Sequence, residues 1–177
     1  MLKASVAVAV SLWASALSAQ ELPADQLAVR DAITSARQQF TEAKNDLVRG
    51  GMRPKRGKSL CDLLPERVAR DWVGTIYDLT TNGDGWGVFS VEMEGDIWIS
   101  TWNNSMSDEG YRTLIDPDSA LFTALSGLSI GQTVIFSGTF FEDTLSTDCF
   151  REKSLTIVGA MSEPEFVFAF SDVRPAP

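Results

Sequence analysis

The order of the segments between residues 71 and 173 is the feature that most constrains the fold of this chain. Three segments with strand patterns come first, one short helical segment follows, and further strand-patterned segments complete the series. Small β-barrels are built from several short strands of this kind, and closing the sheet into a barrel leaves no unpaired edge strand. We therefore predict a mainly-β fold, a five- to six-stranded barrel with one short helix between strands 3 and 4.

Alternation of side chains indicates which side of each strand faces the barrel interior. The expected strands cover residues 72–79, 86–93, 97–102, 133–141, 155–161 and 166–173. Successive side chains in a strand point to opposite faces, so one apolar set should fill the interior. That set is Phe89, Val91, Ile97, Ile99, Phe166, Phe168 and Phe170. Asp116 and Pro117 are expected to begin the short helix.

Two motifs in these segments carry a resemblance to a known family. Trp72-Val73-Gly74 begins the first strand, and residues 131–138 read Gly-Gln-Thr-Val-Ile-Phe-Ser-Gly after the short helix. With the order of elements, they resemble the OB-fold domains grouped as tRNA anti-like and small exported bacterial OB-fold proteins. The resemblance covers about residues 66–173. It implies an OB-like barrel that binds ligands across strands 2 and 3, and it implies no catalytic residues.

The N-terminal region divides into three further predicted parts. Residues 1–19 have the pattern of a signal peptide, with Lys3 before a short apolar run, and an uncleaved anchor is the alternative. Residues 20–48 form an expected amphipathic helix, whose apolar face consists of Val29, Ile33, Ala36, Phe40, Ala43 and Leu47. This face is expected either to dock on the barrel or to dimerise. The barrel domain is expected to cover residues 61–177, in the periplasm or outside the cell.

Residues 49–60 are expected to form a basic linker. It carries Arg49, Arg53, Lys55, Arg56 and Lys58. A solvated linker is one interpretation. Peripheral contact with an anionic surface, such as lipid headgroups or the acidic barrel, is the other.

Cysteine and charge content limit the chemistry further. Cys61 and Cys149 are the only cysteines, and an even pair in an exported chain predicts one disulfide. Residues 66–177 contain six basic and eighteen acidic residues, a net charge of −12, whereas residues 20–65 carry eight basic and six acidic, a net charge of +2. An acidic barrel repels phosphate backbones, so we predict no nucleic-acid binding.

A search for catalytic groups favours a protein that is not an enzyme. The chain has no histidine, which excludes Ser-His and Cys-His pairs and imidazole metal ligands. The carboxylate pairs Glu92/Glu94 and Glu142/Asp143 lack apolar surroundings that would suit acid–base catalysis. We expect no metal and no cofactor, and a carboxylate-based hydrolase remains the enzymatic alternative.

Tryptophans on strands 2 and 3 make the best candidate site. If Phe89, Val91, Ile97 and Ile99 face inward, tryptophans at 86, 98 and 102 face outward, with two asparagines next to them. The candidate ligand-binding residues are Trp86, Trp98, Trp102, Asn103 and Asn104. Indole rings beside amides suit sugars, peptides and other flat polar ligands. The alternative is that this face is the seat of the N-terminal helix.

The sequence therefore predicts an exported binding module that recognises a protein or a small polar ligand on the face of strands 2 and 3. One alternative is an acidic inhibitor of a cationic partner, such as a cell-wall hydrolase. Another is an envelope-structure protein that oligomerises through its helix.

Overall fold

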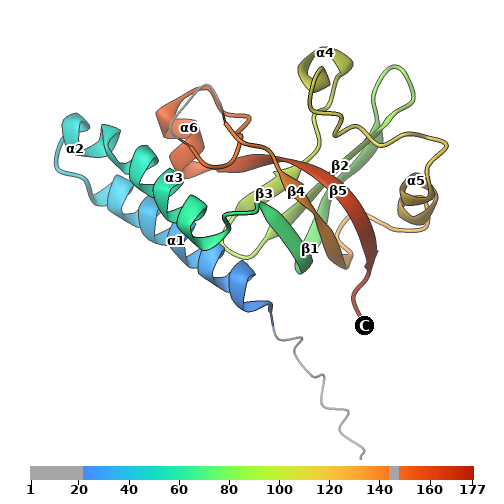
Figure 1. Cartoon of the computed structure of the whole chain (residues 1–177), viewed down its shortest axis with the longest axis horizontal. Helices are drawn as coiled ribbons and strands as arrows, with labels where there is room; N and C mark the ends of the chain where they lie inside the picture. The colour runs from blue at the N-terminus through green and yellow to red at the C-terminus, as the bar shows by residue number, and fades with distance from the viewer. Residues whose placement is uncertain (1–21, 144–147) are drawn as a thin grey trace, which may run out of the picture.

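The computed structural model describes residues 22–143 and 148–177, which form a barrel with helices at both ends (Figure 1). Residues 1–19, interpreted above as a signal peptide, lie outside the described residues. The strands are β1 (Val68–Thr81), β2 (Gly87–Met93), β3 (Ile97–Ser100), β4 (Thr133–Phe140) and β5 (Glu165–Pro175). The helices are α1 (Ala24–Glu42), α2 (Asp46–Gly50), α3 (Met52–Leu63), α4 (Ser105–Asp108), α5 (Ala120–Leu125) and α6 (Ile157–Ser162).

Five strands close the barrel in the order β1-β2-β3-β5-β4. The β3–β5 pair is parallel and the other pairs are antiparallel. The long strand β1 pairs with β2 and with β4, and its register shifts between Ile76 and Asp78 on one side and between Ala69 and Trp72 on the other. Such bulges bend a strand and allow it to serve two neighbours. The predicted mainly-β barrel is confirmed, and a closed five-stranded barrel is compatible with an OB-like fold.

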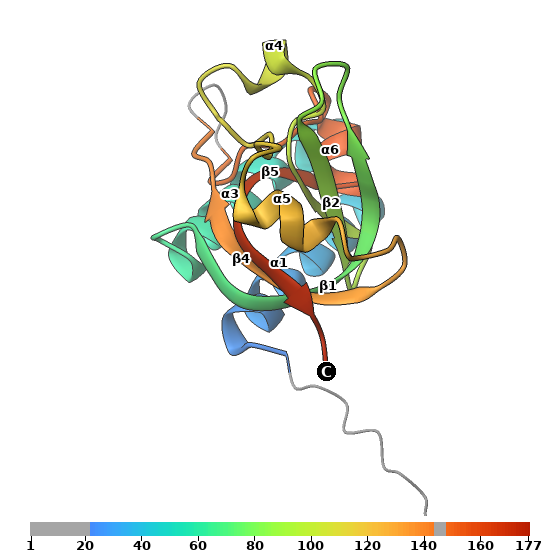
Figure 2. The ribbon, with the colours of Figure 1, turned by 90° about the vertical axis from the view of Figure 1, so that its right-hand side faces the viewer.

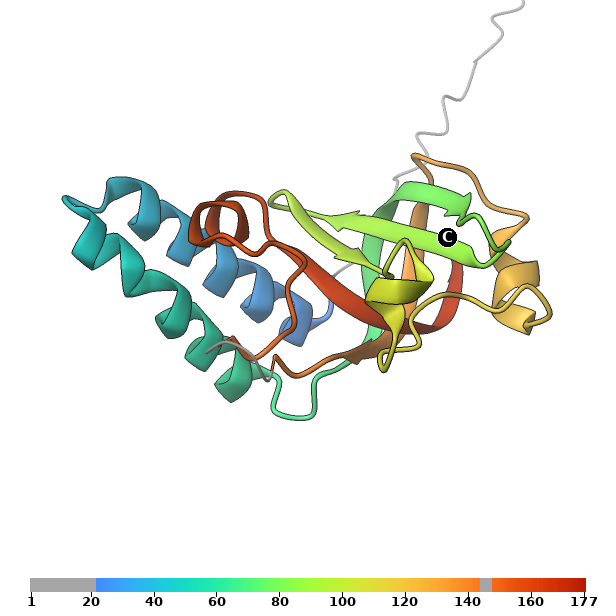
Figure 3. The same ribbon diagram turned by 90° about the horizontal axis from the view of Figure 1, so that it is seen from above.

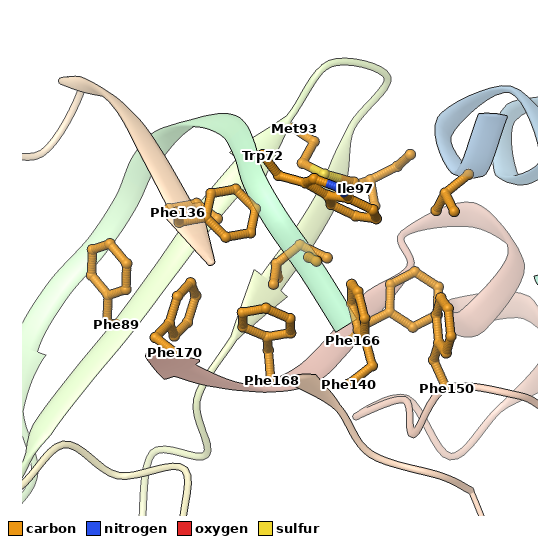
Figure 4. Close-up of a cluster of buried hydrophobic side chains, with 14 of the residues drawn as sticks. Trp72, Phe89, Met93, Ile97, Phe136, Phe140, Phe150, Phe166, Phe168 and Phe170 are labelled. Atoms are coloured by element: carbon orange, nitrogen blue, oxygen red, sulfur yellow. The ribbon is translucent and has the colours of Figure 1, made fainter. Parts of the chain in front are cut away.

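The predicted interior is also confirmed. The four predicted interior residues of β2 and β3 are fully buried, namely Phe89, Val91, Ile97 and Ile99. The phenylalanines of β5 are also buried, and the most exposed of them, Phe170, is 8% exposed. Figure 4 shows aromatic rings lying in a row along the interior. The ring centroids of Phe89 and Phe170 lie 4.8 Å apart, and neighbouring rings continue the row as far as Phe150. The rings meet edge to face except for Phe140 and Phe150, which stack, and such aromatic packing adds stability beyond burial alone.

Helix α1 docks on one end of the barrel, next to the β2–β3 turn (Figure 3). Val29 and Ile33 join the same hydrophobic core as Met93 and Ile97. The Gln26 side chain donates to the carbonyl of Val73 at 2.6 Å and accepts from its amide at 2.8 Å. This is intramolecular docking, the first of the two predicted roles of the helix.

The predicted helical face over residues 20–48 was too long. Helix α1 ends at Glu42, and Asn45 caps the separate short helix α2 by accepting from the amide of Val48. Leu47, which we had placed on the buried face, is 90% exposed.

The prediction of a basic linker over residues 49–60 was wrong. Residues Met52–Leu63 form helix α3, which packs beside α1 (Figure 1). Pro54 lies in its first turn, where proline is tolerated because the missing amide would have no helical partner. Arg56, expected to contact solvent or an anionic surface, is only 2% exposed.

Two more segments differ from the prediction. Residues 155–161 contribute to helix α6 instead of a strand, and Thr156 caps it by accepting from the amide of Gly159. Two helices, α4 and α5, lie between β3 and β4 where one was expected. Ser119, rather than Asp116, caps α5. In Figure 2, α5 lies across the end of the barrel opposite α1.

The Cys61–Cys149 disulfide is confirmed, with the two Cα atoms 5.2 Å apart. It joins α3 to the segment after β4, and it suggests an oxidising environment such as that outside the cytoplasm. Within residues 22–143 and 148–177, no helix has the length and apolar character needed to cross a bilayer.

Candidate functional site

An open groove of about 350 Å³ lies on the outside of strands β1, β2 and β3. One wall comes from the strands, with Tyr77, Asp78, Ser90 and Trp98 among the lining residues. The other wall comes from the chain on either side of α6, with Lys153, Glu163 and Glu165. The volume lies within the range of pockets that hold small ligands or parts of larger ones.

The groove floor follows from the strand phase. Because Phe89 and Val91 fill the interior, Ser90 between them points outward, and Trp98 and Ser100 do so on β3 for the same reason. The register pairs Asp78 with Ser90 and Ser90 with Ser100. These polar residues therefore form a row across three adjacent strands.

A bulge in β1 places two successive side chains in the groove. The β1–β2 register shifts between Ile76 and Asp78, which leaves Tyr77 as the extra residue. Tyr77 and Asp78 both line the groove as a result. The Tyr77 ring meets the Trp98 ring edge to face, with centroids 5.9 Å apart. An aromatic pair thus stands beside a carboxylate.

The groove holds unequal positive and negative charge. Lys153 Nζ lies 2.7 Å from Glu165 Oε1, which also accepts from the Ser100 hydroxyl at 2.7 Å. The carboxylates of Asp78 and Glu163 have no ion pair or hydrogen bond among the described residues. The groove therefore has two carboxylates whose charge the described part of the protein does not offset.

Two polar groups of the groove lining also lack a protein partner. Ser90 is 6% exposed and lines the groove, yet its hydroxyl has no hydrogen bond to any described residue. Its neighbour Ser100 is bonded to Glu165, and Thr101 accepts from the amide of Phe89 at 3.0 Å. The indole N–H of Trp98, also in the groove lining, is buried and has no partner among the described residues. A buried polar group usually has a partner, so these two groups mark points where a ligand could form hydrogen bonds.

The five predicted site residues do not form one face. Trp98 and Asn103 line the groove. Trp102 stands beside it, with its ring 5.8 Å from that of Tyr111 and Lys153 Nζ 5.9 Å from its centroid. Trp86 lines a separate hollow near α4 and is 37% exposed. Asn104 is the N-cap of α4.

The alternative that α1 covers this tryptophan face is wrong. Its hydrogen bonds go to Trp72, Val73 and the β2–β3 turn at the barrel end. Docking there buries Val29 and Ile33 in the barrel core, and the groove remains open.

Sequence reasoning missed several groove residues. Alternation alone could have identified Ser90 and Ser100, which follow from the same phase as Trp98. Asp78 depends on the bulge in β1, and Glu163 comes from a segment that we had expected to be a turn between two strands. No local signal in the sequence brings these two carboxylates together.

A second group of charged residues lies buried between α3 and the chain before α6. Arg53 Nε lies 2.5 Å from Asp148, and Arg56 is bonded to Glu152 and to the carbonyl of Ala160. Burial raises the pKa of Glu152 to about 7, although the positive charge of Arg56 opposes this rise. These contacts attach α3 to the segment that runs from Asp148 to Ala160, so we assign the group a structural role.

The described part of the chain contains no group of three or more Cys, Asp or Glu residues placed to hold a metal ion. The chain matches no family model, and no curated protein or solved structure is significantly similar to it.

Proposed function

We propose that this protein is an exported, non-enzymatic binding module and that the groove on β1–β3 is its ligand site. The observation that carries the proposal is a pair of polar groups in an open groove that have no partner among the described residues, the Ser90 hydroxyl and the buried indole N–H of Trp98. The aromatic edges of Tyr77 and Trp98 beside it suit a small polar ligand or part of a protein.

Two further observations support this proposal. The strand order is that expected of an OB-like barrel, and the tRNA anti-like domains that the sequence resembles bind ligands on the corresponding face. The disulfide agrees with the signal-like pattern of residues 1–19 and with a periplasmic or secreted location. The acidic character of residues 66–177 argues against a nucleic-acid ligand.

The oligomeric alternative loses its main support. It relied on the apolar face of the N-terminal helix, and Val29 and Ile33 of that face are each 1% exposed in the docked helix. A face buried in the barrel core offers little surface for a second copy.

An NMR titration tests the proposed site. Oxidised, ¹⁵N-labelled protein is titrated with N-acetylglucosamine oligomers, amino-acid amides and adenosine monophosphate. We expect at least one polar probe other than the nucleotide to shift the signals of Ser90, Ser100 and the Trp98 indole. Trp98→Ala should abolish these shifts, whereas Trp86→Ala, in the separate hollow, should leave them unchanged. Binding that maps elsewhere, or that a folded Trp98→Ala variant retains, would refute the proposal.

A further inference from the structure

We propose that the groove receives a lysine or arginine side chain of a polypeptide partner. This inference rests on the proposed function, because it assigns a ligand class to the same groove. A cation that enters the groove meets Asp78 and Glu163, neither of which has an ion pair among the described residues. Lys153 carries positive charge in the lining, and Glu165 already holds it at 2.7 Å.

The aromatic wall favours the same kind of ligand. Tyr77 is 58% exposed and packs against Trp98, so ring surface stands beside the two carboxylates. Aromatic faces attract ammonium and guanidinium groups. The protein contains an example of this combination, since Lys153 Nζ lies 2.7 Å from Glu165 and 5.9 Å from the Trp102 ring centroid.

The groove floor supplies a further acceptor. Ser90 is almost completely buried, points into the groove and has no hydrogen-bond partner in the described residues. An ammonium or guanidinium group has several N–H donors and no acceptor, so it can donate to a hydroxyl and to carboxylates together. A neutral sugar would leave the two carboxylates without a counter-charge.

The rim of the groove indicates a polypeptide in preference to a free amine. Lys153 and Glu163 both line the groove, so the chain between them, including α6, forms its edge. Leu155, Val158 and Ile157 on this edge are 88%, 62% and 43% exposed. Adjacent exposed apolar side chains are typical of protein contact surfaces. A partner with apolar residues next to its basic one would cover them, and a small diamine would not.

Calorimetric titration tests the inference. The probes are an acetylated, amidated Lys-Leu-Lys-Leu-Lys peptide, its Gln-Leu-Gln-Leu-Gln counterpart and free cadaverine. We expect the lysine peptide to bind at least about tenfold more tightly than either of the others, a difference typical of charge pairing that is partly shielded from water. The Asp78→Asn/Glu163→Gln double variant should weaken peptide binding by about tenfold or more.

A second double variant provides a matched control. Glu66→Gln/Asp118→Asn removes two exposed carboxylates that do not line the groove, so the net charge changes equally. It should alter peptide affinity by less than about twofold. Equal weakening in both double variants would show attraction to overall charge and would overturn the inference. Cadaverine binding as tight as peptide binding would also overturn it.

The single variant Trp98→Ala and the double variant Asp78→Asn/Glu163→Gln together separate this inference from the proposed function. If Trp98→Ala loses the peptide and Asp78→Asn/Glu163→Gln retains it, the groove remains a ligand site and the cation inference fails. If both retain it, both proposals fail. Tyr77→Ser repeats the aromatic test at an exposed position, where the substitution does not disturb the barrel core, and it should weaken binding severalfold. Circular dichroism on each variant confirms its folding.

Discussion

Replacing Arg56 with methionine should destabilise the protein by about 3–5 kcal/mol, because a buried ion pair that loses one partner leaves an uncompensated charge. Arg56 Nη1 donates to the Ala160 carbonyl at 2.7 Å, and the loss of such a charged hydrogen bond costs about 1.5–3 kcal/mol. The Glu152 carboxylate, left buried without its guanidinium, adds roughly 1–3 kcal/mol. Methionine fills much of the space of the arginine stem, so the effect of a cavity is small.

Urea denaturation of the oxidised protein measures this loss. In the variant, Glu152 loses the larger of the two positive charges that oppose the rise of its pKa, while Arg53 remains, so the folded state holds the Glu152 proton to higher pH. The deficit should therefore be smaller at pH 5 than at pH 8. Changing both residues, Arg56→Met with Glu152→Met, removes the buried carboxylate and should restore more than half of the lost free energy of unfolding.

Two results would refute this reasoning. A loss below about 1 kcal/mol would mean that the Arg56 contacts contribute no more than an exposed ion pair. A deficit that is the same at pH 5 and pH 8 would mean that the unpaired Glu152 carboxylate is not its cause.

Three further predictions concern other parts of the fold. In the chain-entropy model, Cys61→Ser/Cys149→Ala should lower the free energy of unfolding by about 4.6 kcal/mol, because the disulfide spans 88 positions, and urea denaturation of reduced wild-type protein should agree. The folded-state pKa of Glu152 is about 7, above the ordinary 4.5, so the folded state binds its proton more tightly. The tighter proton binding adds about 3 kcal/mol to the free energy of unfolding below pH 4.5, and this added stability is lost as the pH rises to about 7. The free-energy difference between wild type and Glu152→Gln, followed by urea titrations, should shift against wild type over this pH range, and a constant difference would contradict it. Gly138→Ala should cost at least about 2 kcal/mol, since its Cβ would lie 2.1 Å from a backbone oxygen of β5, while Gly83→Ala, with open space around it, should melt within a few degrees of wild type.

The parts of the fold that the sequence predicts are those with a clear local period. Phe89, Val91, Ile97 and Ile99 alternate strictly, and one register places all four inside the barrel. Val29, Ile33 and Phe40 recur with the helical period, and α1 buries all three. In both cases one face of a regular element is buried, so the spacing of the apolar residues in the sequence matches the period of that element.

The errors arise where distant contacts decide the structure. Arg56 has the appearance of a solvated basic residue, yet its partner Glu152 lies 96 positions away. Residues 155–161 form a short apolar run, and such a run suits a strand or a helix equally until its surroundings are known. Their exposed face, with Leu155 and Val158, contradicts the expectation that apolar residues mark a core strand.

The candidate site divides in the same way. Trp98 follows from the strand phase and lies in the groove as expected. Trp86 and Trp102 share that phase but diverge, because β2 begins at Gly87 and β3 ends at Ser100, before either tryptophan. Side chains alternate between the two faces only within a paired strand, so alternation could not predict where these two tryptophans lie.

The closure of the barrel has a consequence for how the chain folds. Ser100 and Glu165, which meet where β3 and β5 run in parallel, are 65 positions apart, and β1 must also find β4 across much of the chain. Closing such long loops costs chain entropy before the paired strands gain any contact energy. Domains of high contact order therefore fold slowly, in milliseconds to seconds. In the oxidised protein, the bond between Cys61 and Cys149 already closes an 88-position loop. An unfolded but oxidised chain therefore begins refolding with one of its longest loops already closed.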